Sequence, residues 1–139
     1  FLLNLAFDPF PFWGYYLILI PGLLGHCFPV YYGFRGGKGV MVCAGMICVM
    51  DWQVLLVILG IFLIATLCSR YISLGSICAA VGFPVATLVL GWFRGNTETL
   101  FWDTLLALIV GGIVFFLHRG NLLRLIQKTE RKISIGRRK

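Results

Sequence analysis

The fold is decided by residues 41–67, which read MVCAGMICVMDWQVLLVILGIFLIATL. This stretch is apolar apart from Asp51, Gln53 and Thr66, and it is long enough to cross a lipid bilayer once as a continuous helix. It can also form two antiparallel helices that reverse direction at Asp51. The choice between these arrangements determines which polar loops of the chain meet on the same side of a membrane.

The composition is that of an integral membrane protein. The chain has 139 residues, of which 60% are hydrophobic and only 12% are charged. Soluble domains carry about 25% charged residues, and a chain of this size cannot bury so much apolar surface. Residues 11–30, 74–92 and 100–117 are further apolar stretches of spanning length. No repeat or flexible linker divides the sequence, so residues 1–139 are expected to form one domain.

The distribution of charge favours the reversal at Asp51. With a turn there, all but one of the basic residues fall on one face: those of the 33–40 loop, Arg70 and the eight of residues 119–139. Only Arg94 falls on the other face. Four of the five acidic residues divide the opposite way. Lys and Arg mark the cytoplasmic side of bacterial-type membrane proteins. We therefore predict an all-α polytopic bundle with about five membrane segments, followed by an amphipathic C-terminal helix.

Residues 41–50 are too short to span a bilayer alone, because a helix rises about 1.5 Å per residue. We expect this leg either to borrow residues from the preceding glycine-rich loop or to lie in a thin, protein-lined region. The chain starts at Phe1 in the middle of hydrophobic sequence, so we also expect its natural N-terminus to be missing.

Three separated turns, predicted to share the cytoplasmic face, carry groups suited to binding phosphate. The first is glycine-rich, which lets backbone N–H groups approach an anion, and it also carries a lysine. The second offers hydroxyls and a guanidinium where a helix begins, and the third offers an amide, a guanidinium and a histidine. The candidate phosphate-binding residues are Gly36, Gly37, Lys38, Gly39, Arg70, Ser73, Ser76 and Arg124.

The C-terminal region is expected to be a helix that lies in the membrane interface. On such a helix Asn121, Arg124 and Lys128 would share one polar strip. The apolar strip would comprise Leu122, Leu125, Ile126 and Ile133.

Several function classes are excluded by the motifs. The glycine loop is no Walker A sequence, because Gly39 stands where a Ser or Thr must hold Mg²⁺. No G-x-S-x-G elbow is present, and neither His26 nor His118 begins a His-x-x-x-x-Asp pattern. We predict no metal and no cofactor, and we interpret the net charge of +7 as membrane topology and lipid contact, with no nucleic-acid partner.

Three motifs resemble those of the bacterial acyl-phosphate-dependent glycerol-3-phosphate acyltransferases. The first runs from Gly25-His26-x-Phe28-Pro29 to Phe34-x-Gly36-Gly37-Lys38-Gly39-Val40, the second is Arg70-Tyr71-Ile72-Ser73-Leu74-x-Ser76, and the third is His118-x-x-Asn121-Leu122-x-Arg124-Leu125 with Thr129-Glu130. The chain departs from the family by having no match to its N-terminal motif. It also has Lys128 where the family usually has a glycine.

The resemblance implies a seven-helix enzyme of the bacterial inner membrane whose active site faces the cytoplasm. Such an enzyme transfers an acyl group from acyl phosphate to the 1-hydroxyl of glycerol 3-phosphate, giving lysophosphatidic acid and phosphate. His118 and Asn121 would be catalytic, with Asn121 orienting the acceptor, while His26 and Glu130 are further candidates. We expect the acyl chain to lie between helices, near Phe83 and Leu88. The acyl-chain preference, the general base and the oligomeric state stay open.

A non-enzymatic alternative is a small membrane transporter or a phosphate-binding membrane subunit. A transporter is expected to carry ionisable groups and broken helices at the bilayer midplane. Here the ionisable groups lie at the ends of segments, which favours chemistry at the interface.

The reversal at Asp51 predicts the side from which this position can be reached. A single cysteine substituted at position 51 should react with a membrane-impermeant thiol reagent from outside the cell, and one at position 38 only from the cytoplasm. Both variants need a background in which the native cysteines are replaced. Labelling of position 51 only from the cytoplasm would refute the hairpin.

Overall fold

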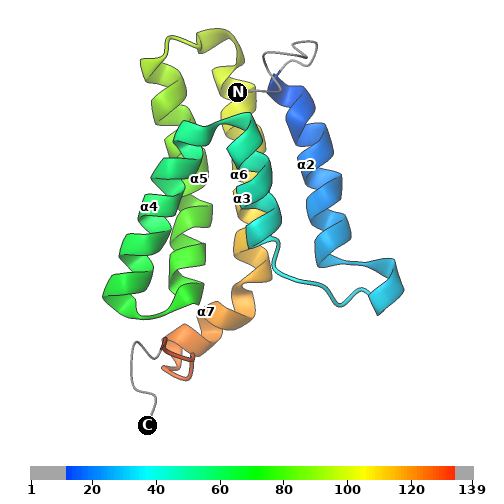
Figure 1. Cartoon of the computed structure of the whole chain (residues 1–139), viewed down its shortest axis with the longest axis vertical. Helices are drawn as coiled ribbons and strands as arrows, with labels where there is room; N and C mark the ends of the chain where they lie inside the picture. Colours follow the sequence, from blue (N-terminus) through cyan, green and yellow to red (C-terminus); the bar gives the residue numbers. More distant parts are fainter. Residues whose placement is uncertain (1–11, 134–139) are drawn as a thin grey trace.

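The structure is a computed structural model that describes residues 12–133 (Figure 1). Its helices form from the apolar runs of the sequence, which are bounded by Gly, Asp and Arg. No strand occurs within these residues, so the prediction of an all-α membrane bundle is confirmed. The helices are α2 (Phe12–Cys27), α3 (Val40–Met50), α4 (Trp52–Ser69), α5 (Ile72–Phe93), α6 (Thr97–Leu117) and α7 (Arg119–Ile126), with a short 3₁₀ turn, η1, at Val30–Tyr32.

The reversal between α3 and α4 occurs at Asp51, as predicted. A carboxylate oxygen of Asp51 accepts hydrogen bonds from the N–H groups of Gln53 and Val54, each at 3.1 Å. These are donors of the first turn of α4, which have no partner within the helix, and Asp is among the residues that best satisfy them. The guanidinium of Arg94, at the end of α5, also donates to both carboxylate oxygens, at 2.5 and 3.1 Å. Asp51 thus begins one helix and ties its start to the α5–α6 turn.

Four helical segments of the described chain are long and apolar enough to cross a membrane. The fifth predicted segment, α3, has 11 residues and is about 16 Å long. It does not borrow helical residues from the glycine loop, because residues 35–38 before it form no helix. Instead α3 packs between α2 and α4, so its short length is covered by protein along the buried side that carries Cys43, Ile47 and Met50.

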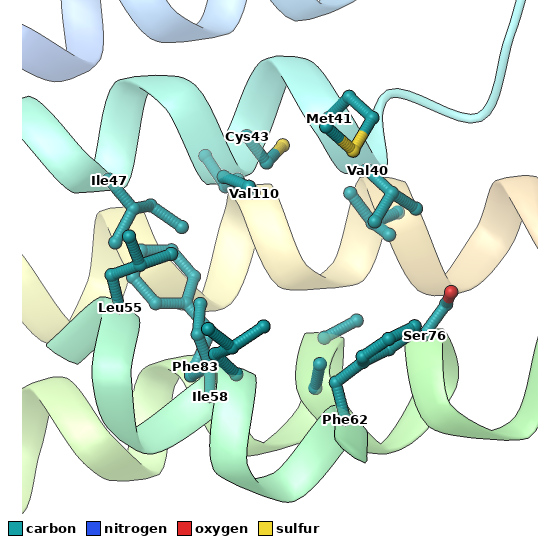
Figure 2. Close-up of a pocket in the computed structure, with 15 residues that line it drawn as sticks. Val40, Met41, Cys43, Ile47, Leu55, Ile58, Phe62, Ser76, Phe83 and Val110 are labelled. Carbon is teal, nitrogen blue, oxygen red and sulfur yellow. The ribbon is translucent and has the colours of Figure 1, made fainter. Parts of the chain in front are cut away.

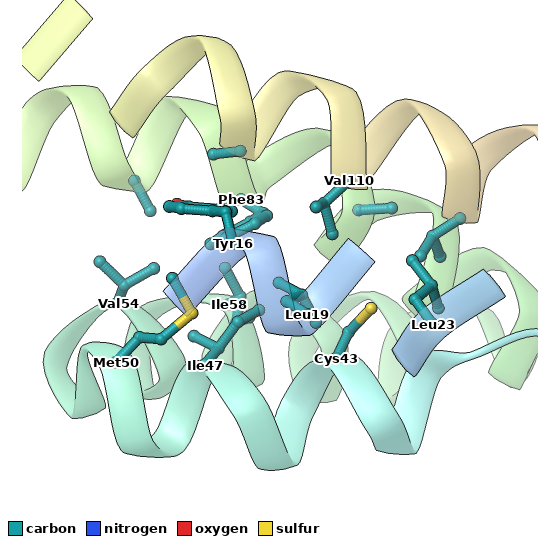
Figure 3. Packing of buried hydrophobic residues seen from close by; sticks show 14 of the residues in the cluster. Tyr16, Leu19, Leu23, Cys43, Ile47, Met50, Val54, Ile58, Phe83 and Val110 are labelled. Atoms are coloured by element: carbon teal, nitrogen blue, oxygen red, sulfur yellow. The ribbon is translucent and has the colours of Figure 1, made fainter. Parts of the chain in front are cut away.

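The core lies where α2, α3, α4, α5 and α6 meet, and it is filled by apolar side chains (Figure 3). Leu19 and Leu23 of α2 are fully buried against this centre, together with Val110 of α6. Two glycines allow the long helices to approach closely. A Cβ on Gly75 would lie 2.0 Å from the Thr66 hydroxyl of α4, and one on Gly111 would lie 2.4 Å from the carbonyl oxygen of Ala80.

The carbonyl of Ala80 can face Gly111 because Pro84, four residues later in α5, has no N–H to donate to it. A proline inside a helix also displaces the carbonyl four residues before it. Only a residue without a side chain fits on α6 opposite that carbonyl. Pro84 and Gly111 therefore fix the register between α5 and α6.

The C-terminal helix is present but shorter than predicted. Helix α7 ends at Ile126, and Lys128 has the left-handed φ of +57°, so Lys128 does not continue the polar strip of Asn121 and Arg124. Ile133 does not belong to the apolar strip either, because its N–H donates to the carbonyl of Arg70 at 2.8 Å. The predicted continuation of the helix past Ile126 is therefore wrong. The chain turns back there because the N–H groups of residues 128–130 bond to carbonyls of the last helical turn.

The three turns singled out in the sequence lie at one end of the bundle, and the Asp51 turn lies at the other with the α5–α6 turn (Figure 1). The first is the loop between α2 and α3, the second joins α4 to α5, and the third is α7 with the segment after it. This arrangement follows from the hairpin, since each reversal sends the next turn to the opposite end.

Replacing Asp51 by Ala should lower the free energy of unfolding by about 1 kcal/mol, because helix α4 loses its N-cap. The exposed ion pair with Arg94 adds little to this figure. The measurement is denaturant unfolding of the protein in detergent micelles. Asp51→Asn keeps an acceptor oxygen for the helix N–H groups and should retain most of the stability. Equal losses in the two variants would show that charge, not capping, matters.

Candidate functional site

Four polar side chains from α5, α7 and the segment after α7 form one hydrogen-bonded group, which we call the Glu130 cluster: Ser73, Asn121, Arg124 and Glu130. The Asn121 amide donates to the Ser73 hydroxyl and to one carboxylate oxygen of Glu130, both at 2.8 Å. The Ser73 hydroxyl donates to the same carboxylate oxygen. Arg124 donates through Nε to the other oxygen at 2.6 Å. The third motif is thereby joined to the second.

The negative charge of Glu130 is strongly stabilised in this position. Hydrogen bonds from Ser73 above all, and then from Asn121 and Arg124, lower the pKa of Glu130 from 4.5 to about 2. Glu130 therefore stays ionised throughout the neutral range. Its charge orients the donors around it, and because Arg124 is bound through Nε, the two Nη groups of that side chain remain available to another anion.

His118 lies at the end of α6, where its side chain is only 2% exposed. Nδ1 is 2.8 Å from the carbonyl oxygen of Val114. Because a carbonyl can only accept, Nδ1 carries the proton and Nε2 is left with its lone pair when the ring is neutral. Burial lowers the pKa of His118, and the nearby charge of Lys38 lowers it further, so the neutral ring is favoured near pH 7.

The glycine loop folds against the end of α2. Gly36 donates its N–H to the carbonyl of Cys27 at 3.2 Å, so this amide is not free to bind an anion. A Cβ on Gly37 would lie 2.5 Å from Nε2 of His26, which places the His26 ring directly against the loop. Gly39 has a φ of +74° and begins α3, and a Cβ there would collide with Leu23.

Residues 37–39 are the part of the glycine loop that can bind an anion. The N–H groups of residues 37–39 have no hydrogen-bond partner within the described part of the chain, and the Lys38 side chain is exposed with no ion pair there. These amides come directly before the N-terminus of α3, where helix N–H groups are also unpaired. The loop lies at the same end of the bundle as the third motif (Figure 1).

The two remaining candidates lie at the edges of this region. Arg70 ends α4 in a left-handed conformation with φ of +63°, and its side chain is exposed. Ser76 is one turn beyond Ser73 on the same side of α5, is 5% exposed, and donates to the carbonyl of Ile72 at 3.2 Å. The structure thus brings Ser73, Asn121 and Arg124 together, with Ser76 adjacent but outside the hydrogen-bonded group.

Ser76 also lines one end of an apolar cavity of about 160 Å³ between α3, α4, α5 and α6 (Figure 2). Phe83 lines this cavity, whereas the side chain of Leu88 lies 44% exposed. Position 88 follows Phe83 by five residues and points to a different side of α5, and the contact of both residues with an acyl chain stays a prediction. No cluster of His, Cys, Asp or Glu that could bind a metal occurs within residues 12–133.

Sequence reasoning underestimated two features. The sequence analysis ranks Glu130 only as a further candidate, yet Glu130 is the acceptor around which the cluster forms. One feature of the sequence could have indicated this: Glu130 is the single acidic residue among the basic residues after position 118. The cavity was not located either. Its walls come from four helices, and their spacing cannot be read from one sequence.

Comparisons with known proteins agree with this arrangement. The family model described as "Glycerol-3-phosphate acyltransferase" matches residues 1–128. The chain belongs to the glycerol-3-phosphate acyltransferase family. Curated relatives with this name include those of Chlorobaculum tepidum, 38% identical over 88% of this chain and 60% of the relative, and of Endomicrobium trichonymphae, 36% identical over 84% and 55%.

Two solved structures of an integral membrane glycerol 3-phosphate acyltransferase, PlsY (YgiH), are similar to this chain with a TM-score of 0.70 each. The glycerol 3-phosphate form is 27% identical and the lysophosphatidic acid form 30% identical, and each match covers 86% of this chain. The chain spans about 60% of the length of the relatives and structures that it matches. Lys128 has a left-handed φ of +57°, a conformation that glycine adopts most easily.

The Glu130 cluster should make the contact between residues 130–133 and the α4–α5 turn dependent on pH. Because the folded pKa of Glu130 is about 2 and the unfolded value is 4.5, the stabilisation is complete above pH 4.5 and is lost as the pH falls towards 2. Exchange of the Ile133 amide hydrogen, corrected for its intrinsic rate, should therefore accelerate over this interval. In Glu130→Ala exchange should already be fast at neutral pH.

Arg131→Ala is the matched control, since its side chain is exposed beside the cluster without belonging to it. This variant should keep the slow exchange of the Ile133 amide. Slow exchange at neutral pH in Glu130→Ala would contradict the role of the carboxylate.

Proposed function

We propose that this chain carries the acyl-transfer site of a membrane enzyme that moves a fatty acyl group from acyl phosphate to the 1-hydroxyl of glycerol 3-phosphate. The products are lysophosphatidic acid and phosphate, and the reaction begins phospholipid synthesis. The observation that carries the proposal is the position of the Glu130 cluster: these polar and charged side chains lie one helical turn from Ser76, which lines one end of an apolar cavity.

Each half of this site suits one part of the substrates. Lys38, the amides of residues 37–39 and the free Nη groups of Arg124 supply donors for two phosphate groups. The cavity is lined by apolar side chains, and a cavity of this size with such walls excludes water and accepts hydrocarbon. An acyl phosphate has this division, with an anionic head and an alkyl tail.

The reaction needs no covalent intermediate with the protein. Acyl phosphate is a mixed anhydride, so the hydroxyl oxygen of glycerol 3-phosphate can attack the acyl carbon directly. A carbon–oxygen bond forms, the bond from that carbon to the phosphate oxygen breaks, and phosphate leaves with the electron pair. The protein contributes by holding both anions side by side and by stabilising the charge that develops. Asn121 is the residue placed to orient the acceptor.

The proton of the attacking hydroxyl has two possible acceptors. One is Nε2 of His118, whose low pKa keeps it neutral and able to accept. The other is an oxygen of the substrate phosphate. His26, which lies against Gly37, is placed to contact the loop that binds phosphate.

We place the site at the cytoplasmic face of a bacterial inner membrane. Support comes from the charge distribution of residues 12–133: the end of the bundle that carries Lys38, Arg70 and α7 holds nearly all of their basic residues, and the Asp51 end holds most of their acids. Membrane lipids surround the exposed apolar side chains of the long helices.

The test is an acyl-transfer assay on the complete encoded protein in lipid vesicles, with acyl phosphate and glycerol 3-phosphate as substrates and lysophosphatidic acid as the detected product. Lys38→Ala should reduce kcat/KM by about 100-fold or more, because a charged donor to the reacting phosphate is lost. Lys132→Ala is the matched control on the same face. Its ammonium lies over the Tyr71 ring at 5.6 Å, outside the cluster, and turnover should be unchanged.

Three results would contradict the proposal. Full activity in Lys38→Ala would remove the glycine loop from the site, and equal loss in both lysine variants would indicate general membrane attraction only. Binding of glycerol 3-phosphate without any lysophosphatidic acid would favour the alternative, a transporter or phosphate-binding subunit.

A further inference from the structure

The apolar cavity ends at a wall that separates it from a second, much smaller void. At one end it is lined by Val40 and Ser76, beside the Glu130 cluster, and at the other by Ile47, Leu55 and Phe83 (Figure 2). The second void, of about 10 Å³, continues towards the Asp51 end of the bundle. It is lined by Tyr16, Ile47, Met50, Asp51, Val54, Phe83 and Thr87. Only Ile47 and Phe83 line both spaces.

Phe83 is the larger of these two side chains and is held firmly in place. It is 4% exposed, lies among the core residues, and its carbonyl accepts a hydrogen bond from the Thr87 hydroxyl at 3.0 Å. The following residue is Pro84, and here the backbone of α5 packs closely against Gly111 of α6. The backbone of Phe83 is therefore held by the α5–α6 contact, and its ring is enclosed by the close-packed core.

Beyond Phe83 the surroundings become unsuitable for hydrocarbon. The small void is bordered by the Asp51 carboxylate and by the Thr87 hydroxyl. From Ser76 to Phe83 is seven residues of α5, which is about 10 Å of helix. An alkyl chain that enters beside Ser76 thus has an apolar path of limited length, with an aromatic ring at its end and polar groups behind it.

We propose that Phe83 sets the upper limit on the length of the acyl chain that this enzyme uses. The inference rests on the proposed acyl transfer and adds to it the residue that determines donor specificity. Chains that end before the ring fit into the cavity in an extended conformation. Longer chains must bend or fold back at the ring, so their transfer falls.

The experiment measures the acyl-chain preference of the complete encoded protein in lipid vesicles, with a mixture of saturated acyl phosphates of increasing length competing for glycerol 3-phosphate. Phe83→Ala joins the two voids and should shift the preference to longer chains. The ratio of kcat/KM for the longer chains to that for the shorter chains should rise above its value in the unmodified protein. Phe83→Leu, which preserves more of the core, should give a smaller shift in the same direction.

Two companion variants make the test specific. Ala79→Leu places extra volume inside the cavity before Phe83 is reached and should shift the preference to shorter chains. Leu88→Ala removes a side chain of similar type from the exposed side of the same helix and should leave the preference unchanged.

The outcomes separate this inference from the proposed function. If the unmodified protein makes no lysophosphatidic acid, the proposed function fails. If it makes lysophosphatidic acid but Phe83→Leu has an unchanged chain-length preference, acyl transfer stands and the limit set by Phe83 is refuted. A shift in Leu88→Ala as large as that in Phe83→Leu would also refute it, because any loss of helix packing would then alter the preference.

Discussion

The reversal of the chain at Asp51 is the constraint on which the rest of the structure depends. A membrane excludes ionised side chains from its interior, so a carboxylate in the middle of an apolar stretch must be brought to a surface. Asp51 reaches one by ending α3 and capping α4, and Arg94 neutralises it from the α5–α6 turn. The reversal makes the number of crossings even between the glycine loop and the second motif. Both therefore lie at the same end of the bundle.

At the opposite end an acid again organises the polar groups, but with a different effect. Glu130 is ionised and accepts from Ser73, Asn121 and Arg124, which come from separate parts of the chain. Its position beside an apolar cavity places charged and hydrocarbon-binding surfaces next to each other. Such a border is what a substrate with an anionic head and an alkyl tail requires.

The parts of the site that could be predicted are those governed by local sequence and charge. The turn at Asp51, the four long helices and the common face of the three motifs all follow from hydropathy and the distribution of Lys and Arg. The extent of α7 could not be predicted in this way. In the sequence, Lys128 and Ile133 continue the helical spacing of α7. In the structure, the chain reverses because of backbone hydrogen bonds after Ile126 and the contact of Ile133 with Arg70. The difference in energy between these alternatives comes from tertiary contacts.

Hydropathy and charge along the chain predict a helical membrane protein and the places where its helices reverse, since bilayer thickness and the cost of burying charge act on each segment separately. Local motifs carry the resemblance to the family. The central position of Glu130 in the polar cluster, the outward orientation of Leu88 and the place of Phe83 at one end of the apolar cavity are set by packing between helices. These outcomes depend on how helices rotate and pack against one another. Helix rotation is set by side-chain fit between neighbours, such as Ala80 against Gly111, which no single segment encodes.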